Sequence, residues 1–495
     1  MWRAFAGLAA ASLFLAVGCG DSGGGGGVPA ASAELPRGAS LVPAGAPAFV
    51  AFNTDFSSKQ WKRDLALLRK FPATRAALKT LFGPGHGIDF QRDIKPAFGP
   101  EADIVWLDFR NNGNDVVGLT RPKDKAKLKA LFAKGGGSPT YTADFRGWTI
   151  FADSRRLLDR LKADAKGGRL ADEGAFKDAV GRLDAHAAVR AYVSGEQVQK
   201  AIDRGLADQG APPMLSEEVG QLVALAGDAS AQPAGARFGG LVSVRSEVHP
   251  NAYTAKLPEE VPADALLYVS FNHLDLFLKK TLKLVAQQNP SFEQQLSQVE
   301  AVFDITLSHD VYPLLSQEGG LAVYPGKGTP TILLLLHVTD EARAKRVLGR
   351  VVTIARLAGS GVRTSSFVEN GVKVDRLVFS RNGGAQVFAA VFGEKLVLVN
   401  DKKTIRTLIS GAGAKLSDDP LFKHVQSDAK MPQRTLGFVY ANLRRSFETT
   451  LQLLQRSGSP VTPADRANAK PLDALLLYAT RAGDRYALTG FLAIK

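Results

Sequence analysis

An internal repeat spans nearly the whole chain. Three sequence blocks occur twice, in the same order and with the same spacing inside each block. The paired blocks are residues 42–53 with 261–272, residues 93–101 with 310–318, and residues 170–177 with 416–423. Three blocks repeated in one order are not a chance similarity, so we expect both copies to adopt the same fold.

Strand and helix patterns follow the same course in both copies. Short apolar and aromatic runs predict strands at residues 48–53 and 266–272, and apolar residues at helical spacing follow. Many strands are joined by short turns, which favours antiparallel pairing. We therefore expect an α+β fold of two tandem related units, residues 35–256 and 257–495. Each unit is expected to be a mainly antiparallel sheet with helices packed on one face, the two related by a pseudo-twofold axis.

The second copy carries an insertion around residues 359–390, where Val372, Val374 and Leu377 form an alternating pattern. Asn370-Gly371 precedes them, and Asn-Gly is a typical two-residue hairpin turn. The insertion therefore predicts one or two added hairpins, with a second turn at Asn382-Gly383-Gly384.

The repeated blocks resemble the domain of unknown function 3352 family. The similarity rests on the Val-Pro-Ala opening at Val42 and Val261, the Asp-x-x-Pro block, and the Leu-x-Asp-Asp/Glu-x-x-Phe-Lys block. It extends over residues 35–495. The resemblance implies an exported bacterial protein, often a lipoprotein, and implies no activity or functional residues.

The amino terminus has the pattern of a lipoprotein signal peptide over residues 1–18. Arg3 is followed by an apolar run too short to span a bilayer, and the run ends in Leu15-Ala16-Val17-Gly18-Cys19. This ending resembles a lipobox, although leucine stands one place earlier than usual. Cys19 is the only cysteine, which excludes internal disulfides. We expect Cys19 to be lipidated; the alternative is an ordinary signal peptide with a chance cysteine.

Residues 19–34 combine the lipidated Cys19 with a flexible tether rich in Gly, Ser and Ala. Removing residues 1–18 would change the net charge from +14 to +13, which favours anionic partners such as anionic lipid or a wall polymer. An exported chain does not meet chromosomal DNA, so no nucleic-acid partner is expected. We expect the protein on the cell membrane, lipid-anchored and facing the extracytoplasmic side.

Repeated carboxylates are the first candidates for chemistry. Asp172-Glu173 and Asp418-Asp419 could act as acid and base or bind a metal, but helix capping explains them better. In that interpretation Asp172 and Asp418 are N-caps, and Phe176 and Phe422 pack inward. Asp93 and Asp310 likewise suit a structural role beside a proline-containing turn.

The remaining motifs predict no catalytic, cofactor-binding or metal site. The histidines are His86, His186, His249, His273, His309, His337 and His424, and no pair has metal-site spacing on a helix. Ser308-His309-Asp310 has the residue types of a catalytic triad, but adjacent residues cannot form the relay. Residues 326–329 lack the spacing of a phosphate-binding loop and suit a turn.

These patterns favour a non-enzymatic, lipid-anchored binding or scaffolding module of the cell envelope. The alternative is a carrier of an apolar ligand in a groove between the two units, with residues 331–338 lining it. That segment is too short for a membrane span and is expected to be a buried strand. Residues 257–495 are long enough to fold alone, and no element is obviously shared across residue 256.

Overall fold

The structure is a computed structural model of the chain. It describes residues 34–82, 88–109, 111, 113–134, 140–207, 221–245, 251–289, 291–326, 329–357, 361–379 and 384–495. Cys19 and the predicted signal peptide lie outside the described residues, so its lipidation stays a prediction. Of the predicted tether, only Glu34 is described.

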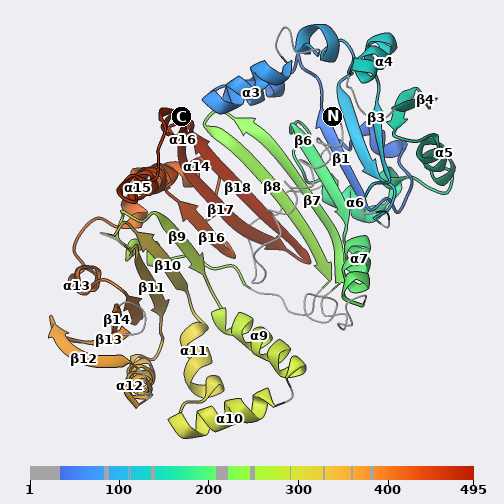
Figure 1. The fold of residues 1–495 in the computed structure, drawn as a ribbon. Coiled ribbons are helices and arrows are strands. Elements are labelled where there is room, and N and C mark those ends of the chain that lie inside the picture. The colour runs from blue at the N-terminus through green and yellow to red at the C-terminus, as the bar shows by residue number, and fades with distance from the viewer. Residues whose placement is uncertain are drawn as a thin grey trace.

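The strands form one sheet of eighteen strands, and all the pairings of the described residues are antiparallel. The α+β class and the antiparallel sheet are therefore confirmed. In space the strand order is β4-β5-β3-β2-β1-β6-β7-β8-β18-β17-β16-β9-β10-β11-β15-β14-β13-β12. Figure 1 shows β8 and β18 side by side near the middle of the molecule.

The described residues of the first half supply eight strands. They are β1 (Ala48–Asn53), β2 (Glu101–Trp106), β3 (Val116–Thr120), β4 (Tyr141–Phe145), β5 (Trp148–Ala152), β6 (Val189–Ser194), β7 (Gln221–Gln232) and β8 (Gly235–Arg245). Its helices are α2 (Lys59–Leu68), α3 (Pro72–Phe82), α4 (Lys125–Lys134), α5 (Arg155–Asp164), α6 (Gly174–Val180) and α7 (Gly195–Ala207). Short turns η1 (Arg37–Ser40), η2 (Phe90–Ile94) and η3 (Leu170–Asp172) join them.

The second half supplies ten strands. They are β9 (Leu267–Phe271), β10 (Gly319–Tyr324), β11 (Thr331–His337), β12 (Val362–Glu369), β13 (Val372–Phe379), β14 (Ala385–Phe392), β15 (Lys395–Val399), β16 (Gly437–Ala441), β17 (Leu472–Ala482) and β18 (Arg485–Ile494). Its helical elements are η4 (Leu257–Glu259), α9 (Leu274–Gln288), α10 (Phe292–Phe303), η5 (Leu307–Val311), α11 (Tyr312–Leu315), α12 (Glu341–Leu357), α13 (Lys402–Ser410), η7 (Leu416–Asp418), α14 (Pro420–Asp428), α15 (Leu443–Arg456) and α16 (Pro463–Ala469). None of the helices in the described ranges is long and apolar enough to cross a membrane.

The strand order is the same on both sides of the β8–β18 pair. Outward from β8 the order is β7, β6, β1, β2, β3, β5, β4, and outward from β18 it is β17, β16, β9, β10, β11, β15, β14. Only the second side continues, into β13 and β12. These two strands form the predicted hairpin, and its turn residues Asn370 and Gly371 both have positive φ, 47° and 79°.

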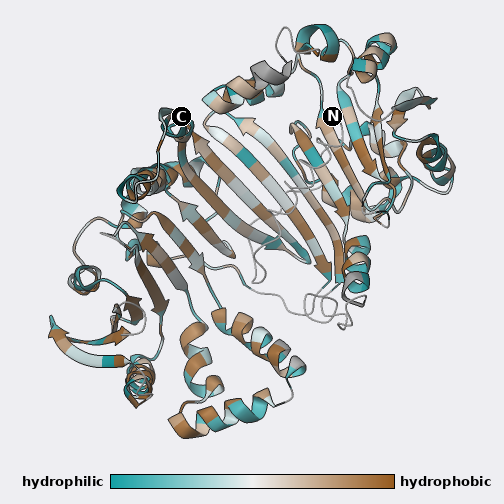
Figure 2. Ribbon diagram, in the orientation of Figure 1, coloured by the Kyte–Doolittle hydropathy of each residue, from teal (hydrophilic) through white to brown (hydrophobic). Residues whose placement is uncertain are grey.

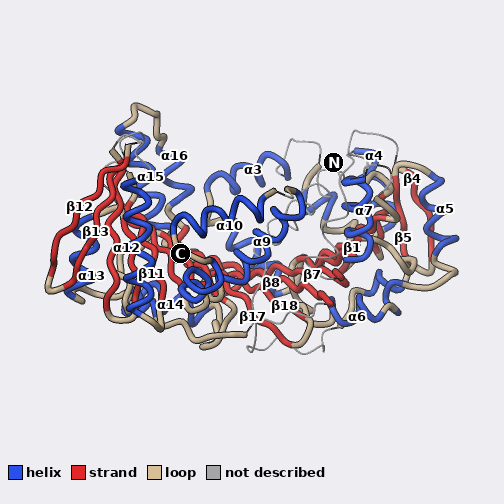
Figure 3. The backbone as a smooth tube through the Cα atoms, turned by 90° about the horizontal axis from the view of Figure 1, so that it is seen from below, coloured by secondary structure: helices blue, strands red, loops and turns tan. Residues whose placement is uncertain are grey.

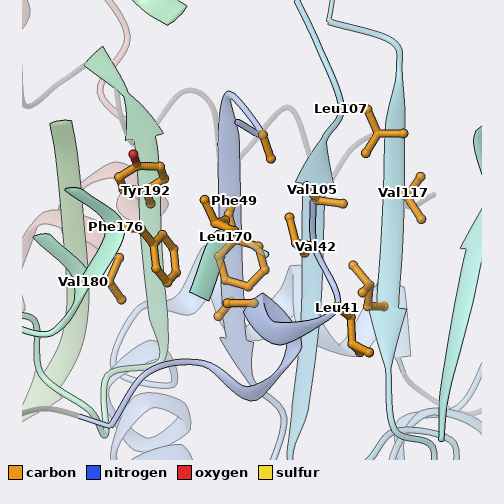
Figure 4. Close-up of a cluster of buried hydrophobic side chains, with 14 of the residues drawn as sticks. Leu41, Val42, Phe49, Val105, Leu107, Val117, Leu170, Phe176, Val180 and Tyr192 are labelled. Carbon is orange, nitrogen blue, oxygen red and sulfur yellow. The ribbon is translucent and has the colours of Figure 1, made fainter. Parts of the chain in front are cut away.

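Each half has its own hydrophobic core on one face of the sheet. Phe176 on α6 packs edge-to-face on Phe49 and Tyr192, within the cluster drawn in Figure 4. Phe422 on α14 packs in the same way on Tyr440. Both phenylalanines are at most 2% exposed, so their predicted burial is confirmed.

Helices lie on both faces of the sheet, so the prediction of helices on one face is wrong. Figure 3 shows α6 and α14 on one side and α3, α9, α10, α15 and α16 on the other. Several strands are brown along most of their length in Figure 2, and because side chains alternate between faces, such strands carry apolar groups on both faces. Both faces therefore attract an apolar cover.

The two halves share the sheet. Nine residue pairs of the β8–β18 ladder, from Arg485↔Ser243 to Ala493↔Gly235, join them. Arg485 also donates a hydrogen bond of 2.5 Å to Asp178 on α6 of the other half. The expectation that no element is shared across residue 256 is therefore wrong, because the closing hairpins of both halves pair edge to edge.

Candidate functional site

The candidate site is the sheet face opposite the two cores, which we call the open face. Side chains alternate between faces along a strand. Leu476, Tyr478 and Phe491 belong to the second core, so their neighbours Leu477 and Leu488 lie on the other face. On the four central strands the open face is made of Leu225, Gly227, Ala229, Ala231, Ala236, Phe238, Gly240, Val242, Leu475, Leu477, Ala479, Arg481, Tyr486, Leu488, Gly490 and Leu492.

A continuous apolar row crosses the open face at right angles to the strands. Directly paired residues along it are Phe52, Val189, Ala229, Phe238, Gly490, Leu477, Val439, Val269, Leu321, Leu334 and Leu398. Eleven strands spaced about 4.8 Å apart give the row a length of about 48 Å. It contains no charged or hydrogen-bonding side chain, so its chemistry is purely apolar.

Part of this row is accessible to solvent. Phe238 is 42% exposed although it lies on an inner strand, and Ile332 on β11 is 47% exposed on the same face. A methyl group placed on Gly240 would meet only Leu488 among the described atoms within 4 Å. No packed layer of described residues therefore covers the central strands at Gly240.

At β1 and β2 of the first half the same face is closed. Val50, Ile104 and Trp106 form a separate buried cluster there, with exposed fractions of 9% or less. Their counterparts in the second half, Val269 and Leu321, are only half-buried. The accessible part of the open face therefore extends from the central strands into the second half.

Helices border the central strands. Asp64 on α2 accepts a hydrogen bond of 2.9 Å from the N–H of Ala231 at the end of β7. Burial raises the pKa of Asp64, and its hydrogen bonds with Ala231 and Gln60 oppose this rise. On the second half, Arg444 of α15 donates to Asp473 on β17. The polar groups of this border hold helices in place, and none of these five residues lies in the apolar row.

The repeated acidic pairs are structural, with one correction. The N-caps are Glu173 and Asp419, one residue later than predicted, because Asp172 and Asp418 end the turns η3 and η7. The Asp419 side chain accepts the N–H groups of Leu421 and Phe422.

The second pair of repeated acids holds turns. The Asp93 carboxylate accepts the Asp89 N–H at 2.8 Å, and Asp310 accepts the Thr306 N–H at 2.9 Å. These backbone hydrogen bonds are the first cause of the lowered pKa of both carboxyls. Their predicted structural role is supported by equivalent geometry in both halves.

A third repeated acid also binds backbone. Glu101 accepts the Gly38 N–H at 2.8 Å, and Glu318 accepts the N–H groups of Lys256 and Leu257. Burial raises the pKa of Glu318, and the two backbone hydrogen bonds oppose this rise. Each carboxylate therefore fixes the turn that opens its half of the chain.

The histidines among the described residues do not gather into a site. His86 and His249 lie outside the described residues. His273, His337 and His424 lie beside Asp275, Glu394 and Asp428 respectively, each in a separate place. Within the described ranges no three His, Cys, Asp or Glu side chains are grouped to hold a metal ion.

Ser308, His309 and Asp310 lie together in η5, where the Asp310 carboxylate accepts from Thr306 and not from the histidine. Of residues 326–329, positions 327 and 328 lie outside the described residues.

Sequence reasoning named only one segment of the open face, residues 331–338. The expectation of a buried strand holds for Leu333 and Leu335, which are in the core, while Ile332 is exposed. One sequence signal could have revealed the open face: segments such as 474–479 do not alternate apolar with polar residues. An antiparallel strand with one solvated face normally alternates apolar and polar residues.

Comparison with known proteins shows the family. The model of the family described as "Protein of unknown function (DUF3352)" matches residues 105–475. A comparison with curated proteins gave no match. Among solved structures, crystal forms I and III of TP0453 each align at 12% identity with a TM-score of 0.24. They cover 48% of this chain and 78% and 94% of theirs, a likeness too weak to support an argument. Because the family model spans well over half of its length, the chain belongs to the DUF3352 family.

Proposed function

We propose that this chain is a non-enzymatic, lipid-anchored protein of the cell envelope that binds apolar molecules on the open face. The observation that carries the proposal is the apolar row, with Phe238 42% exposed in the middle of an eighteen-stranded sheet. Soluble proteins seldom leave a large contiguous apolar surface open unless it binds something.

We infer that residues 35–256 and 257–495 are tandem copies of one unit. The matching strand orders support this, and so do the equivalent hydrogen bonds of Glu101 and Glu318. The duplication has a consequence for binding, because neither unit alone has four central strands. Pairing β8 with β18 joins apolar strands of both units into one continuous face.

The ligand class that fits this face is a hydrocarbon chain, such as that of a fatty acid or lipid. Covering about 200 Å² of apolar surface contributes about 5 kcal/mol at roughly 25 cal/mol per Å². The side chains of the row offer dispersion contacts and no proton transfer, nucleophile or metal ligand, which is why we propose a carrier and not an enzyme.

Binding can be tested with a palmitate analogue that carries a fluorescent anthroyl group. We expect Phe238→Glu to weaken its binding by at least tenfold, because the ligand would have to desolvate a carboxylate. The matched control is Leu357→Glu on α12, where a leucine is 72% exposed away from the central strands. Equal binding by the Phe238→Glu and unmodified proteins would refute the site. Native mass spectrometry of protein purified from its own host would then identify the natural ligand.

Attachment of the protein to the membrane through a lipid on Cys19 is tested separately. Metabolic labelling with radioactive palmitate should label the unmodified protein and not Cys19→Ser, because no thioether can form. Label on the Cys19→Ser protein would refute lipidation at this residue. Fractionation should place the labelled protein in the membrane, facing the extracytoplasmic side.

A further inference from the structure

The helix pair α9–α10 leaves an unusual number of large apolar side chains exposed. Phe277 is 61% exposed and Val285 38%, and on α10 Val299 is 51% and Val302 74% exposed. Phe277 and Val285 are eight residues apart, so they lie along one stripe of α9, and Val299 and Val302 are neighbours on α10. Amphipathic helices normally bury such a stripe, so each of these helices presents an unpartnered apolar stripe.

The opposite side of this pair is firmly held. Lys279 on α9 lies 2.8 Å from the buried Asp275 and 4.7 Å over the ring of Tyr312 on α11. On α10 the Glu300 carboxylate accepts the Leu307 N–H, and Asp304, just after the helix, pairs with Arg350. The exposed stripes therefore belong to anchored helices and are held in a fixed orientation.

We propose that the exposed face of α9–α10 docks on a bilayer surface that contains anionic lipid. Interfacial helices of this kind bury an apolar stripe among the lipid headgroups. Long-range attraction comes from the chain as a whole, whose net charge is +14, and α9 carries the basic residue Lys283. Its one acidic residue, Asp275, is neutralised by Lys279.

The length of chain before Glu34 favours a bilayer as the occupant. About 15 residues between Cys19 and Glu34 reach at most about 50 Å when fully extended. The docking proposal rests on the proposed lipid anchor only because the anchor would keep the described residues close to a membrane. Anchored at Cys19, the described residues stay beside a membrane, and a weak apolar contact is then enough to orient them.

Vesicle cosedimentation of residues 19–495 carrying Cys19→Ser, which lack the predicted apolar signal peptide, tests the docking without the anchor. We expect binding to phosphatidylglycerol vesicles, weaker binding to phosphatidylcholine vesicles, and at least a tenfold loss with Phe277→Asp plus Val302→Asp. Leu357→Asp is the control, because that leucine has a similar exposed fraction, 72%, on α12. Equal binding by the double variant, or an equal loss in the control, would overturn the proposal.

A second measurement separates the alternatives. If sedimentation velocity without lipid shows a dimer that the double variant abolishes, the occupant is a second copy of this chain and the bilayer proposal fails. The anthroyl-palmitate titration distinguishes docking from ligand binding. Phe277→Asp plus Val302→Asp should keep ligand affinity, and Phe238→Glu should keep vesicle binding. In Phe277→Trp, a blue shift of fluorescence on vesicle addition should confirm that α9 itself enters the interface.

Discussion

The helix pairs α2–α3 and α9–α10 follow equivalent strands, yet their contacts differ. The first pair is tied to the opposite half: Lys70, just before α3, bonds to the Ile494 carbonyl at 3.1 Å, and the Ala73 N–H bonds to Asn468 on α16 at 2.8 Å. Among the described residues, the second pair packs on α11 and within itself, in its own half, and leaves Phe277 exposed. The two helix pairs follow equivalent strands, but their tertiary contacts differ. The first pair is bonded to the other half, and the second pair keeps an exposed apolar side chain.

Separating the halves has the largest expected effect. The buried residues of the second core all come from residues 257–493, whereas the first core includes Ala487 of the other half. We expect isolated residues 257–495 to fold but to self-associate, because β18 loses its β8 neighbour and becomes an open edge. Circular dichroism and sedimentation velocity measure both properties. A molten fragment would show that the second half depends on the first for its core.

The next largest expected effect is the loss of stability when a buried phenylalanine is removed from either core. Phe176→Ala and Phe422→Ala should each lower the free energy of unfolding by about 3–5 kcal/mol, as truncation of a buried phenylalanine does. Equal losses in urea denaturation would support equivalent cores. If one variant kept the unmodified midpoint, that phenylalanine would not be part of a cooperative core.

A buried carboxyl distinguishes the first half. Burial and the neighbouring Glu101 raise the pKa of Asp103 well above its ordinary value, and the equivalent residue of the second half is Gly320. The folded state therefore keeps a proton that the unfolded state releases above about pH 4. Stability should fall as pH rises from there toward the folded pKa.

Asp103→Asn should remove that part of the pH dependence, so the variant should gain stability relative to the unmodified protein as pH increases. Thermal unfolding between pH 4 and 8 is the measurement. Parallel curves for the two proteins would contradict a protonated Asp103.

A smaller effect concerns the link between α3 and α16. Asn468→Ala removes the acceptor of the Ala73 N–H and should cost about 1 kcal/mol, the usual net value of a hydrogen bond. Val302→Asp, the corresponding change on α10, should leave stability within about 0.5 kcal/mol, since the side chain is already 74% exposed. A large loss from Val302→Asp would mean that α10 has a structural partner.

The smallest expected change in stability tests which aspartate is the N-cap of α14. Asp419→Ala should cost about 1 kcal/mol through the lost N–H bonds at the start of α14. Asp418→Ala should cost less than about 0.5 kcal/mol, because its side chain is exposed and caps nothing. The reverse order in urea denaturation would restore Asp418 as the cap.

Much of the fold was predictable from local patterns and the repeat. The strand at Ala48–Asn53, the Asn370-Gly371 hairpin and the burial of Phe422 depend on nearby residues, whose spacing and turn chemistry act over a few positions. The repeat then carried these assignments from one half to the other. The family followed from the same blocks.

The pairing of β8 with β18 was decided only in the tertiary structure, and with it the open face. Both strands carry apolar side chains on the open face, but their pattern does not say which edge each will meet or which face stays uncovered. Strand pairing is made by backbone groups that every residue carries, and the partner is chosen by which edges the folded halves bring together. Phe238 is an unremarkable strand residue in the sequence, and it becomes the centre of a candidate binding face because no described helix covers that part of the sheet.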